Sequence, residues 1–178
     1  MLKPAELPGS TKKYRKENYR FRSWLKIHAD PKDLDRRFRR LHRELFADYD
    51  CSSCRNCCKQ YRGSIPREDL ARDAKALGMT VEAFKARFLQ ENEDPWAEDY
   101  LTRSRPCDFL QADGSCLLGD HKPESCRTYP HTDQPDRRGS LLSFLDIISI
   151  CPVACEIWDR LKEEYDFDGF MDYGSIWE

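Results

Sequence analysis

Four cysteines within eight residues are the feature that most constrains this chain. The stretch CSSCRNCC places Cys51, Cys54, Cys57 and Cys58 at residues 51–58, which we call the octad. In a helix, Cys57 would point about 100° away from the face shared by the other three, and in an extended strand Cys57 and Cys58 would point to opposite sides. One metal centre is therefore a poor match for all four. We expect the octad to supply two adjacent metal sites, or one site and a free thiol.

The downstream cysteines complete this pattern. The 178-residue chain has nine cysteines, an odd number, and the adjacent pair Cys57 and Cys58 is difficult to accommodate in a full set of disulfides. Two tetrahedral four-thiolate sites need eight ligands. The predicted ligands are Cys51, Cys54, Cys57, Cys58, Cys107, Cys116, Cys126 and Cys151. Cys155 is the ninth cysteine, and we expect it to be an ordinary buried residue.

The cellular compartment of the protein decides between disulfides and metal binding as the role of these cysteines. The N-terminal sequence has no apolar segment typical of a secretion signal, and no stretch approaches the roughly 18 apolar residues of a membrane span. We therefore predict a cytoplasmic protein. Clustered cysteines in a reducing compartment indicate metal binding or catalysis before they indicate structural disulfides.

The spacing leaves two kinds of metal centre open. A zinc ribbon supplies two separated CxxC pairs, and this sequence has no second CxxC. A CxxCxxC run with a remote Cys-Pro is typical of chains that hold iron-sulfur clusters, and Cys151 is followed by Pro152. Zinc and an iron-sulfur cluster both remain as predicted cofactors.

Hydrophobic periodicity predicts a mainly helical chain with a few short strands. Only 39% of the residues are hydrophobic, 35% are charged and the mean hydropathy is -0.82. We therefore expect a small hydrophobic core, and a bound metal would add to the stability of such a fold. The predicted fold is a small α+β, cysteine-rich, metal-stabilised domain preceded by a basic helical arm. We expect a continuous apolar run at 140–152 to form a buried strand. We expect amphipathic helices over 12–28, from residue 33 up to the octad, and over 67–77, 81–89 and 153–165.

Positive and negative charges are distributed unevenly along the chain. Residues 1–50 carry 14 Lys/Arg against 8 Asp/Glu, and the remainder carries 16 against 24. We predict a basic helical extension at 1–50, a metal-binding domain at 51–155 and an acidic C-terminal helix and tail at 156–178. Helical spacing indicates that the aromatic residues of the arm pack inward. We therefore favour docking of the arm on the acidic remainder over a nucleic-acid partner.

The cysteine motifs resemble a known family. CxxCxxCC at 51–58, PCDFL at 106–110, CLL at 116–118, KPESCRTYP at 122–130 and CP at 151 are similar to the CxxCxxCC cysteine-cluster family, the YkgJ-type zinc- or iron-chelating domain. The resemblance covers residues 51 to about 155. It implies metal chelation, and one branch of the family is similar to flagellin lysine N-methylase, which implies an iron-sulfur enzyme as an alternative.

Signals for a particular reaction are few. The eight glycines form no phosphate-binding loop, so any chemistry has to reside in the metal centre, and whether the chain is an enzyme stays open. Arg127 directly follows a predicted ligand and Tyr129 lies close behind, so both are candidates to contact the ligands from outside. The predicted partners are a metal or cluster and a protein partner or substrate, with no membrane. A third hypothesis is a metal-stabilised adaptor for protein or nucleic acid.

Overall fold

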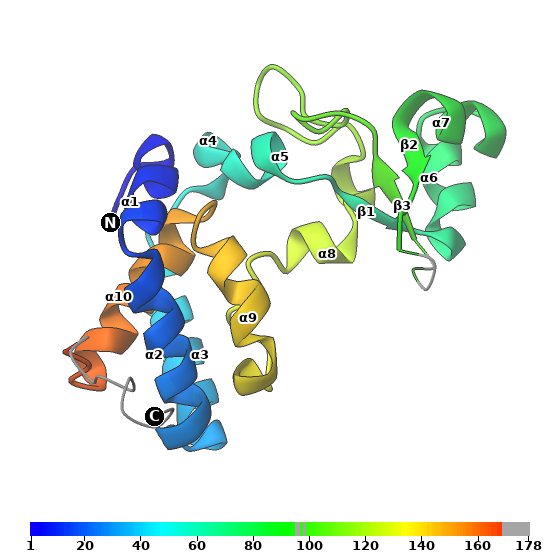
Figure 1. Ribbon diagram of the computed structural model, residues 1–178. Coiled ribbons are helices and arrows are strands. Elements are labelled where there is room, and N and C mark those ends of the chain that lie inside the picture. Colours follow the sequence, from blue (N-terminus) through cyan, green and yellow to red (C-terminus); the bar gives the residue numbers. More distant parts are fainter. Residues whose placement is uncertain (95–96, 98, 169–178) are drawn as a thin grey trace. The chain divides into compact units, whose positions relative to one another are not determined.

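The computed structural model describes residues 1–94, 97 and 99–168, and these residues form two compact units (Figure 1). The helical unit comprises Met1–Tyr49 and Pro130–Glu178, and the cysteine unit comprises Asp50–Tyr129. The predicted division at residues 50 and 155 follows sequence motifs rather than contacts, and it stays a prediction.

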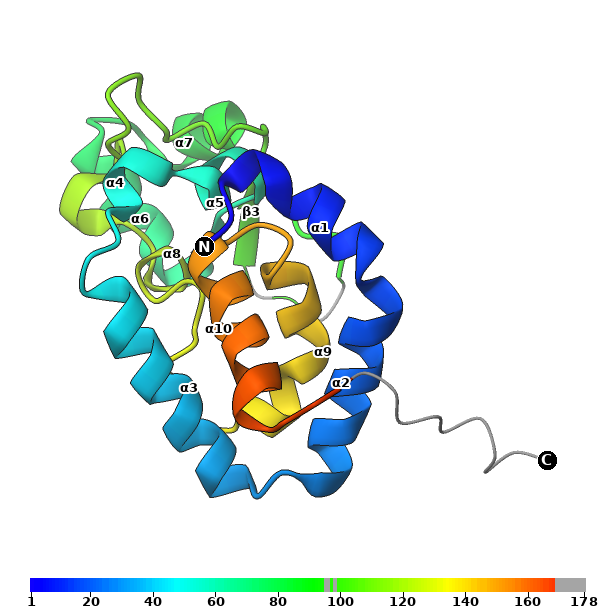
Figure 2. The ribbon, with the colours of Figure 1, turned by 90° about the vertical axis from the view of Figure 1, so that its left-hand side faces the viewer.

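The helical unit is a bundle. Its elements are η1 (Pro4–Glu6), α1 (Leu7–Lys13), α2 (Arg15–His28), α3 (Pro31–Phe46), α9 (Arg137–Ile147) and α10 (Pro152–Glu164). Figure 2 shows α9 and α10 between α2 and α3, and close contacts join α3 to α9 and α10 and join α2 to α9. The predicted helices over 12–28 and 153–165 are confirmed, and the helix predicted from residue 33 forms but ends at Phe46 rather than at the octad. Each carries an apolar stripe at helical spacing, which is buried in this bundle.

Aromatic rings fill the centre of the bundle. Phe21, Phe38, Phe144 and Trp158 are all buried, and the Phe21 and Trp158 rings meet edge to face at 4.8 Å. The Trp158 indole Nε1–H donates to the Asn18 side-chain oxygen at 3.1 Å, so the one polar atom of this ring has a partner. This unit therefore has an extensive apolar core of its own.

The strand predicted at 140–152 is wrong. The apolar run forms most of α9, which ends at Ile147, followed by a turn that leads to α10. A short continuous apolar run has no period that separates a buried strand from a buried helix. Here Leu141, Phe144 and Ile148 lie at spacings of three and four, and all three are buried. Packing between helices therefore decided the conformation.

The cysteine unit combines short helices with a small sheet. Strands β1 (Ser64–Pro66), β2 (Leu89–Glu91) and β3 (Asp99–Thr102) pair antiparallel in the order β1-β3-β2, with Ile65 opposite Tyr100 and Gln90 opposite Leu101. The helices are α4 (Cys51–Cys54), α5 (Asn56–Gln60), η2 (Arg67–Asp69), α6 (Leu70–Ala76), α7 (Val81–Phe88), η3 (Gly119–His121) and α8 (Glu124–Arg127). Helices and a sheet in one chain confirm the α+β class.

The core of the cysteine unit lies between the sheet and helices α6 and α7. Its buried residues are Ile65, Leu70, Ala74, Phe84, Phe88, Leu89, Tyr100, Phe109 and Leu118, and Cys107 and Cys116 pack against them. Thr80 caps α7, because its hydroxyl accepts from the Ala83 N–H at 3.2 Å. Two predicted ligands are thus anchored on the apolar core.

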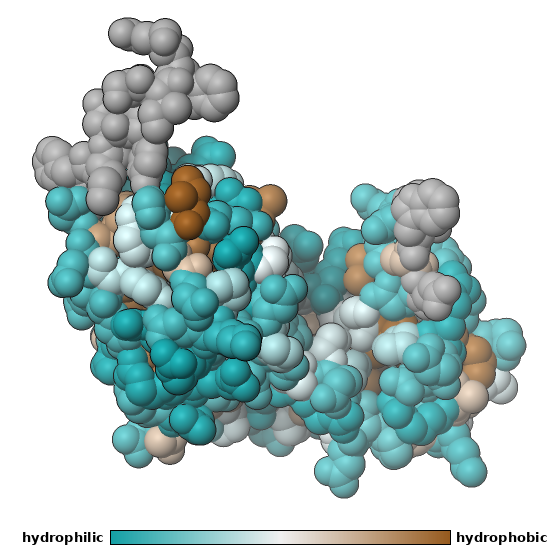
Figure 3. Space-filling view, turned by 90° about the horizontal axis from the view of Figure 1, so that it is seen from below, coloured by the Kyte–Doolittle hydropathy of each residue, from teal (hydrophilic) through white to brown (hydrophobic). Residues whose placement is uncertain are grey.

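The exterior is strongly polar. Figure 3 shows hydrophilic residues over most of the face in view, with apolar residues in smaller patches. Among residues 1–94, 97 and 99–168, no helix combines the length and apolar character needed to cross a membrane.

Candidate metal centre

The octad folds as two short helices joined by one left-handed residue. The Asp50 side chain caps α4 by accepting from the Ser52 N–H at 2.7 Å. Arg55 then adopts φ 48° and ψ 21°, which ends α4 and redirects the chain into α5. Such a backbone is uncommon for a residue with a Cβ. The octad is therefore neither one helix nor one strand, and Cys51 and Cys54 lie on a different helix from Cys57 and Cys58.

A backbone hydrogen bond ties the octad to the downstream cysteines. The Cys107 N–H donates to the Cys58 carbonyl at 2.8 Å. A bridge between Leu110 and Cys116 then closes the loop that follows. Segments almost fifty residues apart in sequence are therefore adjacent in this unit.

Four thiols line one small cavity in the cysteine unit. The cavity has a volume of about 30 Å³, and its cysteines are Cys58, Cys107, Cys116 and Cys126. Ile65, Phe109 and Leu110 supply apolar wall, and Arg55 and Lys122 are the charged residues that line it. The space suits an occupant of about the size of one water molecule. Four thiols are also the number that a tetrahedral thiolate site requires.

Hydrogen bonds to sulfur favour the thiolate form of two of these residues. Burial raises the pKa of Cys107, while the Phe109 N–H and the Thr102 side chain hydrogen-bond to it and act in the opposite direction. Burial also raises the pKa of Cys126 to about 11, and a hydrogen bond with the Ser125 side chain opposes that increase. Removing a proton from these thiols costs free energy, which a bound cation would offset.

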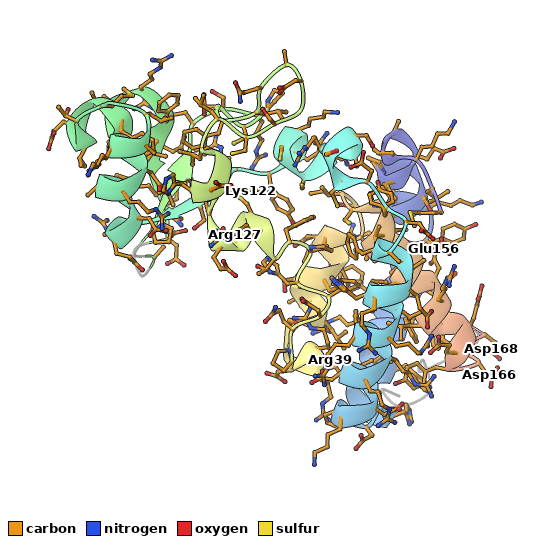
Figure 4. All side chains as sticks on the ribbon, turned by 180° about the vertical axis from the view of Figure 1, so that it is seen from behind. Arg39, Lys122, Arg127, Glu156, Asp166 and Asp168 are labelled. Atoms are coloured by element: carbon orange, nitrogen blue, oxygen red, sulfur yellow. The ribbon has the colours of Figure 1, made fainter. Side chains whose placement is uncertain are left out.

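Two cations lie within electrostatic reach of the thiols. Lys122 lowers the pKa of Cys51, Cys57, Cys58 and Cys126, although stronger effects act on each of them. Arg55 acts in the same direction on Cys51 and Cys58. Lys122 follows η3 and is labelled in Figure 4. A positive side chain next to this cavity stabilises the negative charge that thiolates develop.

A hydrogen bond joins the thiol groups of the adjacent cysteines Cys57 and Cys58. A hydrogen bond between the two thiol groups lowers the pKa of Cys58 to about 6 and, together with burial, raises that of Cys57. The cavity-lining member of the pair is therefore the one that ionises first. Cys57 and Cys58, which cannot be told apart from the sequence, therefore differ in pKa and in their contact with the cavity.

A family profile matches most of this region. The profile is CxxCxxCC, described as "Putative zinc- or iron-chelating domain", and it matches residues 50–156. The chain belongs to this family. The curated proteins and the solved structures that were compared give no match.

The remaining predicted ligands of the CxxCxxCC chain lie in different surroundings. Cys51 is exposed, Cys54 and Cys57 are partly buried, and none of these three lines the cavity. Cys151 belongs to the helical unit, where it is buried, so its placement beside the other ligands stays a prediction. Cys51, Cys54, Cys57, Cys58, Cys107, Cys116, Cys126 and Cys155 are free thiols. Among the residues that the structure describes, no three His, Cys, Asp or Glu donors already converge at metal-binding distances.

Cys155 is buried, as predicted for an ordinary core cysteine. It is 5% exposed on α10 in the helical unit, and its sulfur lies 3.9 Å from a carboxylate oxygen of Asp159. Burial raises the pKa of Cys155 to about 12. It is a protonated thiol at neutral pH.

The two residues predicted to support the ligands make other contacts. Arg127 forms an ion pair with Glu124 at 2.6 Å, and the Tyr129 ring packs edge to face on Tyr61 at 5.4 Å. Neither residue lines the cavity, so their predicted role stays a prediction. Sequence reasoning missed Lys122. Lys122 stands in the KPESCRTYP block, and that position was the available signal.

Proposed function

We propose that this CxxCxxCC chain chelates a single divalent metal ion, zinc in the first place, at Cys58, Cys107, Cys116 and Cys126. The observation that carries the proposal is that these four cysteines line one cavity of about 30 Å³. A mononuclear ion matches that space better than an iron-sulfur cluster, which brings several iron and sulfide atoms. Zinc favours four thiolates in closed structural sites.

The charges of the cavity support an occupied, fully thiolate site. Four thiolates around a divalent ion carry a net charge of -2, and Arg55 and Lys122 are two positive side chains that line the same cavity. Without an ion, burial keeps Cys107 and Cys126 protonated, because it raises the pKa of each. Metal binding would therefore release protons and become weaker at low pH.

The other four predicted ligands lie outside this site. Cys51, Cys54 and Cys57 lie on the two octad helices, and Cys151 precedes α10 in the helical unit. Their part in metal binding stays a prediction. The same reduced thiols support a cytoplasmic location, where cysteines are kept free.

A site with four protein thiolates has no open position for substrate. Such centres stabilise a fold, whereas catalytic zinc sites keep one position for water or substrate. We therefore propose chelation with a structural consequence as the primary function. An iron-sulfur enzyme similar to flagellin lysine N-methylase is the alternative, and it requires a redox-active cluster.

Elemental analysis of anaerobically purified protein tests the proposal. We expect a colourless protein with stoichiometric zinc, and loss of one zinc equivalent in the Cys107→Ser/Cys116→Ser variant. Cys155→Ser is the matched control because Cys155 is buried outside the cavity, and it should retain its zinc. A brown protein with iron and acid-labile sulfide would favour the cluster alternative. A folded protein that stays metal-free after reconstitution would refute chelation.

A further inference from the structure

The positive charge of the N-terminal arm lies in its first two helices. Residues 1–29 carry eight Lys/Arg and two Asp/Glu, whereas residues 30–50 carry six of each. The whole charge excess of the arm therefore belongs to the segment that contains α1 and α2, and α3 is balanced.

Helix α3 uses its arginines within the helical unit. Arg37 donates to Asp33 at 2.7 Å and to Glu164 of α10 at 3.0 Å. Arg40 forms ion pairs with Glu44 at 3.0 Å and with Glu164. This is the docking of the basic arm on the acidic C-terminal helix that the sequence predicts, and the Met1 amino group adds an ion pair with Glu156 of α10 at 3.2 Å.

Four cations of α1 and α2 have no such ion-pair partner among the described residues. Glu17 is the only carboxylate of α2, and it forms an ion pair with Lys162 of α10 at 2.7 Å. Within residues 1–94, 97 and 99–168, Lys12, Lys13, Arg15 and Lys16 form no ion pair, and all four are exposed. Internal docking therefore does not account for this charge.

An exposed aromatic ring accompanies these cations. Tyr19 is 43% exposed, and the Arg15 guanidinium lies 5.7 Å from its ring centroid. The inward packing predicted for the aromatic residues holds for Phe21, but it is wrong for Tyr14 and Tyr19, which are both exposed. The outer face of α2 thus combines positive charge with an accessible ring.

The buried face of α2 excludes one common role for a basic helix. Asn18, Phe21 and Leu25 are buried in the bundle, so the apolar side of α2 is not available for insertion into a lipid surface. The exposed side of α2 therefore offers positive charge and the aromatic ring of Tyr19. Proteins use this combination to bind single-stranded nucleic acid, through phosphate contacts and base stacking.

We propose that the basic face formed by Lys12, Lys13, Arg15, Lys16 and Tyr19 binds single-stranded nucleic acid. The lysines and Arg15 neutralise phosphates, and Tyr19 stacks on a base. The site reads no sequence, because phosphate contacts and stacking are common to all nucleotides. It is independent of the proposed metal function.

Fluorescence anisotropy with labelled 20-nucleotide oligo(dT) and oligo(U) tests the proposal on the full-length protein. The variant Lys12→Gln/Lys13→Gln/Lys16→Gln should weaken binding at 50 mM salt at least about tenfold. The slope of log K against log salt should decrease by about 2, since each lost phosphate contact contributes roughly 0.7 for single strands. Tyr19→Ala should weaken binding roughly fivefold or more, and Tyr19→Phe should retain it.

The control removes the same charge from α3. Arg36→Gln/Arg39→Gln/Arg43→Gln changes three exposed arginines and should leave the salt slope nearly unchanged (Arg39, Figure 4). Circular dichroism checks that every variant is folded. Equal loss in both triple variants would overturn the proposal, because net charge alone would then explain binding. So would an inert Tyr19→Ala variant, tighter binding of a 20-base-pair duplex, or competition by phosphatidylserine vesicles.

Discussion

Gly114→Ala is a substitution at the point where the downstream cysteine loop meets the octad. Gly114 has φ +83°, and a Cβ there would lie 3.0 Å from the Ser52 backbone oxygen and 3.7 Å from the Arg55 Cγ. The left-handed backbone costs a residue with a Cβ roughly 1–2 kcal/mol. The contact with a backbone atom, which cannot rotate away, adds an overpacking cost of roughly 1–3 kcal/mol. We expect Gly114→Ala to destabilise the cysteine unit by about 2–5 kcal/mol.

Gly78→Ala is the matched control for this prediction. Gly78 has φ +64°, but a Cβ there would meet nothing within 4 Å, so this variant reports the backbone cost alone. Urea unfolding followed by circular dichroism gives the free energies, and metal release to a chromogenic chelator reports on the cysteine unit. We expect Gly114→Ala to lose more stability and to release metal at lower urea. Equal effects of the two substitutions would refute the reasoning that the loop is pressed against the octad.

Three further predictions concern single side chains. Cys116→Ser should weaken zinc binding roughly 100-fold in a competition titration, because the binding free energy of a structural zinc site, about 10–16 kcal/mol, is divided among four thiolates. Unchanged affinity would exclude Cys116 as a ligand. Asn18→Ala should destabilise the protein by about 1–3 kcal/mol in urea unfolding, because Trp158 loses the acceptor of its buried N–H, and a neutral result would contradict this. A hydrogen bond from Arg37 lowers the pKa of Asp33, so this carboxylate stabilises the fold above about pH 4 and the effect is lost as pH falls through the lowered pKa. Asp33→Asn should therefore reduce stability by roughly 0.5–1 kcal/mol at pH 7 and less at pH 2, and a loss independent of pH would refute this.

The helices were predictable where local signals and packing agree. Leu34, Phe38 and Leu41 recur at spacings of four and three in α3, and all three are buried. Thr80 caps α7 through its hydroxyl. In α9 the apolar run carried no such period over its full length, so the sequence favoured the wrong conformation. That choice depended on neighbours that are distant in sequence.

The candidate site was predictable as a set of residues and not as a geometry. The cysteine spacing marks eight ligands, but it does not tell which thiols face one cavity. That selection depends on the left-handed turn at Arg55, on the hydrogen bond from Cys107 to Cys58, and on the loop closed by Cys116. The first is an uncommon conformation for arginine, the second joins residues 49 positions apart, and the third is an isolated bridge without a flanking strand pattern. Periodicity reports none of them.

The distribution of cysteines between the units follows from what each unit can bury. The helical unit has long helices and an aromatic core around Trp158, and both of its cysteines, Cys151 and Cys155, are buried. The cysteine unit has no helix longer than eight residues and no strand longer than four among its described residues, yet it holds the other seven cysteines. Small units with short elements commonly need a metal or a disulfide to fold. The thiols are concentrated where apolar burial alone is least sufficient, which is why we assign the metal a structural role before a catalytic one.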